Sequence, residues 1–311
     1  MFTAPPSCEK GSRMYQKRLS QIHSKALKLR FDDSARIVLM SDCHRGDGGL
    51  ADTFFRNRNI YLAALQHYNA EKYTYIELGD GDELWENRHF SDIVEAHADV
   101  FDLLARFHTE KRLYMLFGNH DIVKANPAFA RQSPGPRLDA RQYRLAMLFS
   151  RMPVYEAIRL VYAPSGGEIF LVHGHQVDFC NSTMWRLARF LVRYVWRPLE
   201  SRGVKDPTSA AQNYTRRKKT EERLIGWVSE NRRMLVSGHT HRPTFPAAGE
   251  PPYFNDGSCV HPGCVTAVEI AGGSIALVKW CVKVRADGTL YVGRDVIAGP
   301  APLAAYFDIP R

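Results

Sequence analysis

Five short segments of this sequence are rich in aspartate, histidine and asparagine, and each one directly follows an apolar stretch of strand-like residues. The segments are SDCH (41–44), GDGDE (79–83), GNHD (118–121), HGH (173–175) and GHTH (238–241). Carboxylate, imidazole and amide groups are the ligands that Mn²⁺, Fe and Zn²⁺ take in proteins. The glycines beside these residues permit tight turns that could direct the side chains into one cavity. The pattern therefore predicts a metal site assembled from distant parts of the chain.

The elements that must position these segments follow from hydrophobic patterning. Short apolar runs predict strands at 36–40, 73–78, 113–117, 168–172 and 234–237. Apolar residues at helical spacing predict helices over 53–68, 90–107 and 142–150. Alternating strands and helices imply a largely parallel α/β sheet, whose strand ends share one rim where ligands bind. We therefore expect the five segments to converge on one pocket.

The remainder of the chain divides into an N-terminal extension, an insert and a β-rich tail. Residues 1–35 are a basic extension, with an amphipathic helix over 12–29 that either packs on the domain or contacts a membrane or partner. Residues 36–311 form the main domain, and 179–233 are a mostly helical insert within it. Another strand is expected over 154–162, and three more over 265–270, 275–284 and 290–292.

Composition is that of a globular protein. The 311 residues are 45% hydrophobic and 24% charged, and no apolar run is long enough to cross a bilayer. The N-terminus has no apolar stretch typical of a signal peptide, so we expect a cytoplasmic protein with reduced cysteines. The net charge of +9 fits an anionic substrate and permits peripheral contact with an anionic membrane, such as the inner face of a cell membrane.

In this order, the motifs DxH, GD, GNHD, HGH and GHTH resemble those of the calcineurin-like metallophosphoesterase superfamily. The resemblance implies a four-layer α/β/β/α sandwich of two sheets between helices, with a helical cap insert. It also implies two divalent metal ions, with Mn²⁺ as the leading choice and Fe or Zn²⁺ as alternatives. The implied ligands are Asp42, His44 and His241 for one ion, Asn119, His173 and His239 for the other, and Asp80 as the bridge.

The resemblance also suggests how phosphate chemistry would proceed. His120 would protonate the leaving oxygen, as its counterpart is thought to do in the family. Two acids, Glu83 and Asp121, are alternative partners that would orient this histidine. Arg45 and His175 flank the motifs and are further candidates for substrate contact or for support of the metal ligands.

The insert adds candidates for substrate binding. Residues 184–199 form a basic, aromatic-rich amphipathic helix, and a dense basic run with Asn213, Arg216, Arg217 and Lys218 follows it. In position and charge the insert is similar to the lid of the bacterial UDP-2,3-diacylglucosamine pyrophosphatases, and the sequences GDELWE and GHTHRP add to that likeness. That branch has arginine where this chain has His120. The insert is therefore interpreted either as a lid that grips substrate or as a cap whose arginines face solvent.

These features favour hydrolysis of a phosphoester or pyrophosphate bond in a phosphorylated small molecule, nucleotide-linked or lipid-linked. A serine/threonine phosphoprotein phosphatase is an alternative, although the chain has GDGDELWE and GNHD rather than that group's GDxVDRG and GNHE. A non-catalytic scaffold that keeps the fold is an alternative of another class. No nucleic-acid partner is expected, because no recognised motif accompanies the positive charge. The sequence does not define the oligomeric state.

Overall fold

Strand β2 (Arg36–Met40) shows how the sequence builds the centre of the fold. Its side chains alternate between two apolar cores, with Val38 and Met40 in one core and Ile37 and Leu39 in the other. A strand that is apolar on both faces must lie between two covering layers. The computed structural model, which describes residues 6–132, 134, 137–178, 185, 189–190, 192–193 and 214–307, has this layered arrangement.

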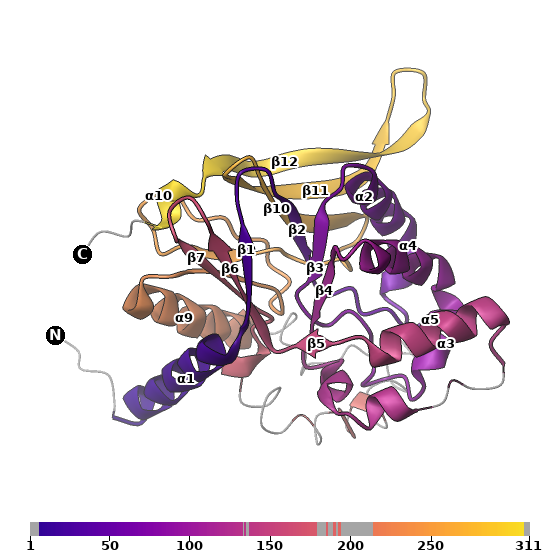
Figure 1. The fold of residues 1–311 in the computed structure, drawn as a ribbon, viewed down its shortest axis with the longest axis horizontal. Helices are drawn as coiled ribbons and strands as arrows, with labels where there is room; N and C mark the ends of the chain where they lie inside the picture. Colours follow the sequence, from indigo (N-terminus) through magenta and orange to yellow (C-terminus); the bar gives the residue numbers. More distant parts are fainter. Residues whose placement is uncertain are drawn as a thin grey trace.

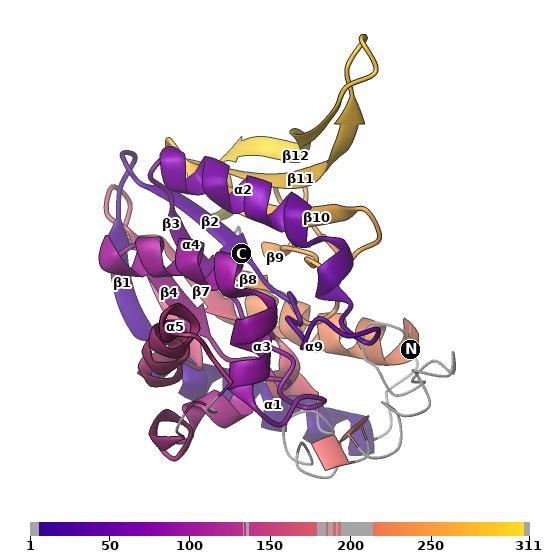
Figure 2. The ribbon, with the colours of Figure 1, turned by 90° about the vertical axis from the view of Figure 1, so that its right-hand side faces the viewer.

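The larger sheet has seven strands in the order β12-β11-β10-β2-β3-β4-β5. Strands β2, β3 (Thr74–Glu77), β4 (Leu113–Leu116) and β5 (Val154–Tyr155) run parallel, as the predicted crossovers require. Strands β10 (Cys264–Ala271), β11 (Ser274–Val284) and β12 (Leu290–Pro302) extend the sheet in antiparallel pairing. The hairpin of β11 and β12 projects beyond the rest of the molecule (Figure 2).

The smaller sheet has five strands in the order β1-β6-β7-β8-β9. Its members are β1 (Leu27–Phe31), β6 (Ala157–Tyr162), β7 (Glu168–Val172), β8 (Met234–Ser237) and β9 (Tyr253–Asn255). One core of buried side chains from both sheets, including Leu39, Ile158 and Leu171, fills the space between them. The two sheets therefore form a sandwich.

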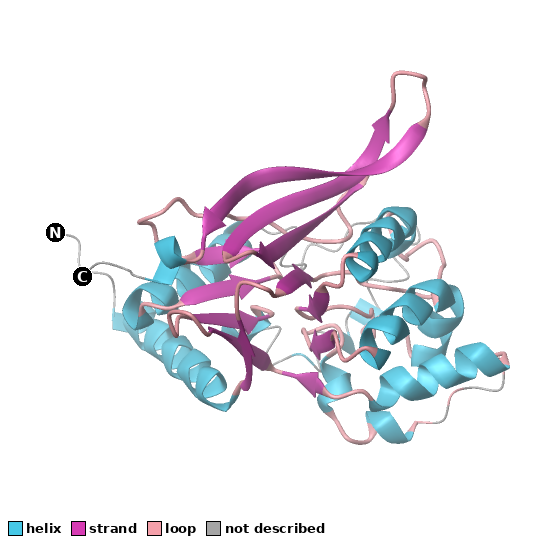
Figure 3. Ribbon diagram, turned by 45° about the horizontal axis from the view of Figure 1, so that its top comes forward, coloured by secondary structure: helices cyan, strands magenta, loops and turns pink. Residues whose placement is uncertain are grey.

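Helices cover the outer face of each sheet. One group packs on the seven-stranded sheet: α2 (Arg58–Ala70), α3 (Phe90–Ala96), α4 (Ala98–Thr109) and α5 (Ala140–Arg151). The other group, α1 (Pro6–Lys25) and α9 (Tyr214–Asn231), packs on the five-stranded sheet. The two groups lie on opposite sides of the strands (Figures 1 and 3). The predicted α/β/β/α sandwich is confirmed.

Short helical turns and one small helix complete the described elements. The 3₁₀ turns are η1 (Phe54–Arg56), η2 (Ile122–Ala125), η3 (Phe129–Arg131) and η4 (His175–Val177). The last described helix is α10 (Ala304–Phe307). Turn η4 begins within the HGH segment, so the chain leaves the site through a tight turn.

The N-terminal segment is more integrated than the sequence predicted. The predicted helix over 12–29 ends at Lys25, and the residues after it form β1, which pairs in parallel with β6. On α1, Leu19 and Ile22 are buried against Trp227 of α9. The region 1–35 therefore supplies a strand and a covering helix to the domain, and its description as an extension is corrected.

Other predicted elements differ in their boundaries. The predicted helix over 90–107 is broken at His97, which has non-helical backbone angles and a buried ring that contacts Asp52 at 2.7 Å. The predicted strand over 154–162 divides into β5 and β6, which belong to different sheets. The prediction missed β9, and β12 is longer than the three residues expected. Most of the predicted insert helix over 184–199 lies outside the described residues.

Candidate metal centre

The loops that follow the strands are held in a backbone conformation that non-glycine residues rarely adopt. Asp42, His44, Asp80, His239 and His241 all have positive φ, between 48° and 66°. Such angles cost free energy, and they persist where the surrounding structure requires them, often at functional sites. Five of the predicted metal ligands are thus in strained positions that turn their side chains inward.

Hydrogen bonds between neighbouring loops hold these turns in register. The backbone N–H of Asp42 donates to the Gly79 carbonyl at 3.1 Å, and that of His44 donates to the Asp80 carbonyl at 2.9 Å. Gly79, with φ of 99°, approaches the next loop so closely that an added Cβ would lie 2.7 Å from the Gly118 nitrogen. Glycine is therefore required here to bring three loops together.

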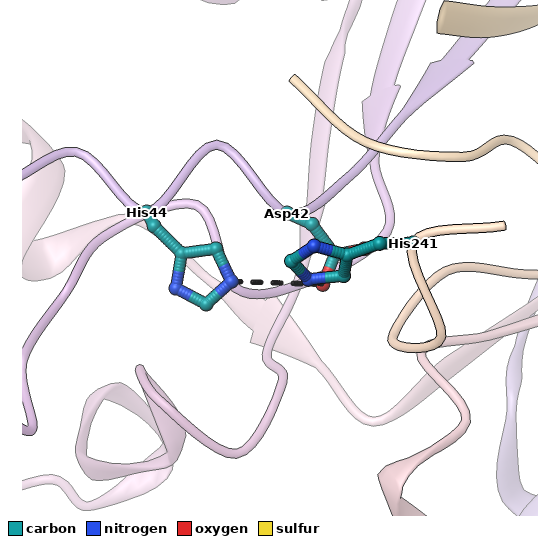
Figure 4. A group of neighbouring side chains, drawn as sticks. All are labelled: Asp42, His44 and His241. Carbon is teal, nitrogen blue, oxygen red and sulfur yellow. Dashed lines mark ion pairs between the residues drawn. The ribbon is translucent and has the colours of Figure 1, made fainter. Parts of the chain in front are cut away.

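The first cluster of potential ligands contains Asp42, His44 and His241 (Figure 4). One ligand atom from each residue lies within 4.8 Å of the others. The His241 Nε2 is 3.0 Å from Asp42 Oδ1, and the His44 Nε2 is 3.8 Å from the same oxygen. The three side chains come from two loops far apart in sequence and point toward one another.

The second cluster contains Asp80, His173 and His239, all buried. The His173 Nε2 is 3.1 Å from Asp80 Oδ2, and the His44 Nε2 of the first cluster is 3.9 Å from the same oxygen. The Asp80 carboxylate therefore lies between the two clusters, at the place expected of a bridging ligand. Asn119 is buried and directly precedes His120 in the sequence. The backbone N–H of His120 donates to Asp80 Oδ1 at 2.8 Å.

The protonation of these groups reflects closely packed opposite charges. Burial would raise the pKa of Asp42, but the neighbouring imidazoles of His241 and His44 hold it well below its usual value. The pKa of Asp80 is likewise lowered, because the effect of the charges of His173 and His120 is larger than the opposing effect of burial. Burial opposes protonation of His173, yet Asp80 raises its pKa to about 9. The carboxylates are thus ionised and attract positive charge into the centre.

Unpaired buried atoms show that this centre fits metal ions. Five atoms of predicted ligands are buried and have no hydrogen-bond partner: Asp42 Oδ1, His44 Nε2, Asn119 Oδ1, His173 Nε2 and His239 Nε2. Buried polar atoms are normally paired, so such a concentration needs a physical explanation. The other ring nitrogens of His44 and His173 are engaged, by Glu83 at 2.8 Å and by the Leu78 carbonyl at 2.9 Å. Metal-binding histidines typically have such a partner, which leaves Nε2 free as the ligand.

His120 lies beside the clusters with its ring fixed on two sides. Its Nδ1 contacts Glu83 Oε1 at 2.8 Å, and its ring stacks on Trp85 with centroids 4.4 Å apart and an angle of 25°. Burial would raise the pKa of Glu83, but the charges and hydrogen bonds of His120 and His44 lower it to about 2. The ionised carboxylate accepts a hydrogen bond from Nδ1–H, and the Nε2 side of the imidazole is left for other contacts.

Of the two acids predicted as partners of His120, Glu83 makes the contact. Asp121 accepts backbone N–H groups from Gly118 at 2.7 Å and Gly81 at 3.1 Å. Its side chain therefore links two of the loops, and burial raises its pKa to about 6. The geometry corrects the expectation that Asp121 could orient His120.

Arg45 is held by buried acidic side chains. Its side chain is fully buried, with Nε bonded to Asp82 at 2.7 Å and both terminal nitrogens bonded to Glu77 at 2.7 and 2.9 Å. Lys124 forms a further ion pair with Asp82. Of the two roles predicted for Arg45, support and substrate contact, its burial and its bonds to Glu77 and Asp82 fit support.

The remaining predicted substrate residues lie in three different places. His175 is buried, with its ring centroid 5.4 Å from that of His173, and burial holds its pKa well below the usual value. Its ring lies against those of His173 and His239 and is closed off from solvent, so it is not placed to contact substrate. Arg216, Arg217 and Lys218 lie in the first turns of α9. Asn213 lies outside the described residues.

Sequence reasoning missed several residues that the structure brings to this region. Trp85 stacks on His120, and the GDELWE sequence that contains it was the available signal. Arg242 follows a ligand directly, and its side chain is exposed and 3.4 Å from Glu221 of α9. The Ser41 hydroxyl lies within hydrogen-bond distance of the carboxyl groups of Asp42 and of the buried Asp256. Both residues lie in motifs noted in the sequence, Arg242 in GHTHRP and Ser41 in SDCH, but no role was predicted for either.

Comparison with known proteins agrees with this geometry. The family model of the calcineurin-like phosphoesterases matches residues 35–243. The chain therefore belongs to the calcineurin-like phosphoesterase family, and metal-dependent phosphoester chemistry is the activity typical of that family.

Comparisons with individual proteins give no information on the substrate of this chain. No curated protein sequence matches the chain significantly. Among the solved structures that match, the crystal structure of Chaetomium thermophilum Vps29 is 10% identical, with a TM-score of 0.38, and the match covers 85% of this chain and 96% of that one. Similarity at this level carries no argument about function. Within the described residues, no helix has the length and apolar character needed to cross a membrane.

Proposed function

We propose that this protein is a dinuclear-metal-dependent phosphoesterase that hydrolyses a phosphoester or pyrophosphate bond. The observation that carries the proposal is the set of buried, unpaired ligand atoms in two adjacent clusters, with the Asp80 carboxylate between them. Asp42, His44 and His241 would hold one ion, Asn119, His173 and His239 the other, and Asp80 both. Mn²⁺ is our first choice, with Fe or Zn²⁺ as alternatives, because the ligands are a mixture of oxygen and nitrogen atoms.

The bound ions would supply Lewis acidity, which neutralises phosphate charge and acidifies water. The chain's own part in the reaction centres on His120. Because its Nδ1–H is bonded to Glu83, a protonated ring presents its Nε2–H to the leaving oxygen. Its side chain is 22% exposed, so a substrate can reach it. Trp85 keeps the plane of the ring fixed by stacking on it.

For the substrate, we propose a phosphorylated small molecule, either nucleotide-linked or lipid-linked. Support comes from the net charge of +9 and from the basic first turns of α9, which carry Arg216, Arg217 and Lys218. Arg242 lies between α9 and His241 and provides one more cation close to the ligands. One guanidinium group can donate two parallel hydrogen bonds to two oxygens of a phosphate, so these arginines suit a phosphate group. We propose a cytoplasmic location, and the net positive charge supports peripheral contact with anionic membranes.

Purified protein loaded with Mn²⁺ tests the proposal on a panel of aryl phosphate monoesters, aryl diesters, nucleotide diphosphates and nucleotide-lipids. We expect turnover of at least one class that a chelator abolishes. His120→Ala should keep the metals and lose most of the rate, whereas Asp80→Ala should lose both metals and rate. Metal binding without turnover on the whole panel would favour a non-catalytic scaffold, and full activity in folded Asp80→Ala would refute the mechanism.

A further inference from the structure

Arg193, from the segment between the HGH and GHTH motifs, donates hydrogen bonds to the loop that carries Glu83 and Trp85. Its Nε donates to the Trp85 carbonyl at 2.8 Å, and its Nη2 donates to the Leu84 carbonyl at 2.8 Å and the Asn87 carbonyl at 3.0 Å. The sequence predicted that the arginines of this segment either face solvent or grip substrate. Arg193 does neither in these contacts, because its guanidinium is directed at main-chain oxygens.

The loop that Arg193 contacts is the one that determines where His120 lies. The Glu83 carboxylate holds both His120 and His44, and the ring of Trp85 stacks on His120. Glu83 also accepts the backbone N–H groups of Trp85 at 3.2 Å and Glu86 at 3.3 Å. The carboxylate and the Trp85 ring therefore move together with the backbone of residues 83–87.

Arginine suits this contact for a geometric reason. Its guanidinium is flat and rigid and carries five N–H donors, so one side chain can satisfy several carbonyls that lie in different directions. Lysine offers a compact charge on a flexible stem and would retain only part of the contact. The guanidinium bonds the carbonyls of the loop, whereas Glu83 bonds its N–H groups. The loop is thus held by charged side chains through both kinds of main-chain group.

We propose that Arg193 is a positioning residue for His120, acting through the loop of residues 83–87. Arg193 fixes the backbone of this loop, and the loop fixes the Glu83 carboxylate and the Trp85 ring against the imidazole. The inference rests on the proposed function, because it assigns Arg193 to the proton donor of that reaction. It predicts that Arg193 affects the rate of the chemical step more than the binding of substrate.

The first test needs no catalytic activity. Hydrogen exchange of the metal-loaded full-length protein is measured by mass spectrometry for wild type, Arg193→Lys, Arg193→Ala and the control Arg106→Ala, an exposed arginine on α4. We expect peptides covering residues 83–87 to exchange faster in Arg193→Ala, less so in Arg193→Lys, and unchanged in Arg106→Ala. Unchanged exchange in this loop, with Arg193→Ala folded, would overturn the proposal.

The second test uses the substrate that wild type hydrolyses best. We expect Arg193→Ala to lower kcat about tenfold or more with a much smaller change in KM, because misplacing a catalytic group slows the chemical step. Arg193→Lys should fall between, and combining Arg193→Ala with Trp85→Ala should cost less than the two single effects together. A rise in KM with unchanged kcat would show that Arg193 serves only binding. If wild type hydrolyses nothing on the panel, the proposed function fails, while the exchange experiment still decides whether Arg193 fixes the loop.

Discussion

Replacing Glu83 with glutamine should impair both the support of the metal ligand His44 and the orientation of His120. The Glu83 carboxylate contacts the Nδ1 atoms of His44 and His120, each at 2.8 Å. Glutamine has nearly the same shape, but it removes the negative charge and can present an accepting oxygen to only one ring. The substitution therefore weakens both contacts without creating a large cavity.

The size of the effect follows from the electrostatics of the site. Glu83 is 6% exposed, and its pKa falls from the usual 4.5 to about 2 because of His120 and His44. This lowering corresponds to about 3 kcal/mol of interaction shared between the two histidines. If each histidine accounts for about half of this interaction free energy, losing either contact changes a rate or binding constant by roughly a factor of ten. We expect Glu83→Gln to lower kcat about tenfold and to weaken metal binding about tenfold, in line with other partners of metal-bound histidines.

The assay is a set of pH–rate profiles at saturating Mn²⁺, together with activity as a function of Mn²⁺ concentration. Glu95→Gln is a matched control, because Glu95 is an exposed residue of α3. If Glu83→Gln kept the wild-type kcat, pH profile and metal dependence, the assignment of Glu83 to His120 and His44 would be refuted.

Three further predictions concern stability. Arg45→Met should lower the free energy of unfolding, measured by chemical denaturation, by about 3–5 kcal/mol, because it leaves Glu77 and Asp82 buried without their partner. A loss under about 1 kcal/mol would show that the network of Arg45, Glu77 and Asp82 does not support the loops. Adding Mn²⁺ to chelator-treated protein should raise Tm, since a ligand at a hundred times its Kd stabilises by about 2.7 kcal/mol, and an equal rise in folded Asp80→Ala would contradict the site. Burial, together with the charges of Arg233 and Arg159, lowers the pKa of His23 in the folded protein. The unfolded chain therefore takes up this proton first, and stability should fall as pH drops below about 6.5; His23→Gln should flatten that dependence in thermal melts, and an unchanged slope would exclude His23 as its source.

The fold and the ligand clusters were accessible from the sequence because local patterns determine them. Strand β2 is apolar on both faces, which indicates a layer between two others, and Asp42 and His44 follow it directly. Parallel strands of one sheet end at the same rim, which accounts for the loops after β2, β3 and β4. The HGH and GHTH loops follow β7 and β8 of the other sheet, so their convergence with the first three depends on how the two sheets pack.

What the sequence did not reveal depends on contacts between distant residues. The stretch Leu27–Phe31 alternates apolar and basic residues, which is a strand pattern, but it is short and its first residues were included in the helix predicted over 12–29; the structure pairs it with β6. Arg45 follows a metal-ligand motif and resembles a phosphate-binding residue, but Glu77 and Asp82 bury it. The choice between Glu83 and Asp121 likewise depended on which loop each carboxylate faces. Such tertiary contacts leave no periodic signal.

Counting the metal ions bound by the purified protein tests the central claim most directly. Elemental analysis after saturation with Mn²⁺ and removal of excess metal should give about two ions per chain in wild type, as a two-metal site requires, and a markedly lower content in folded Asp80→Ala. Equal metal content in wild type and Asp80→Ala, or no retained metal in either, would contradict a centre in which Asp80 joins two clusters of ligands.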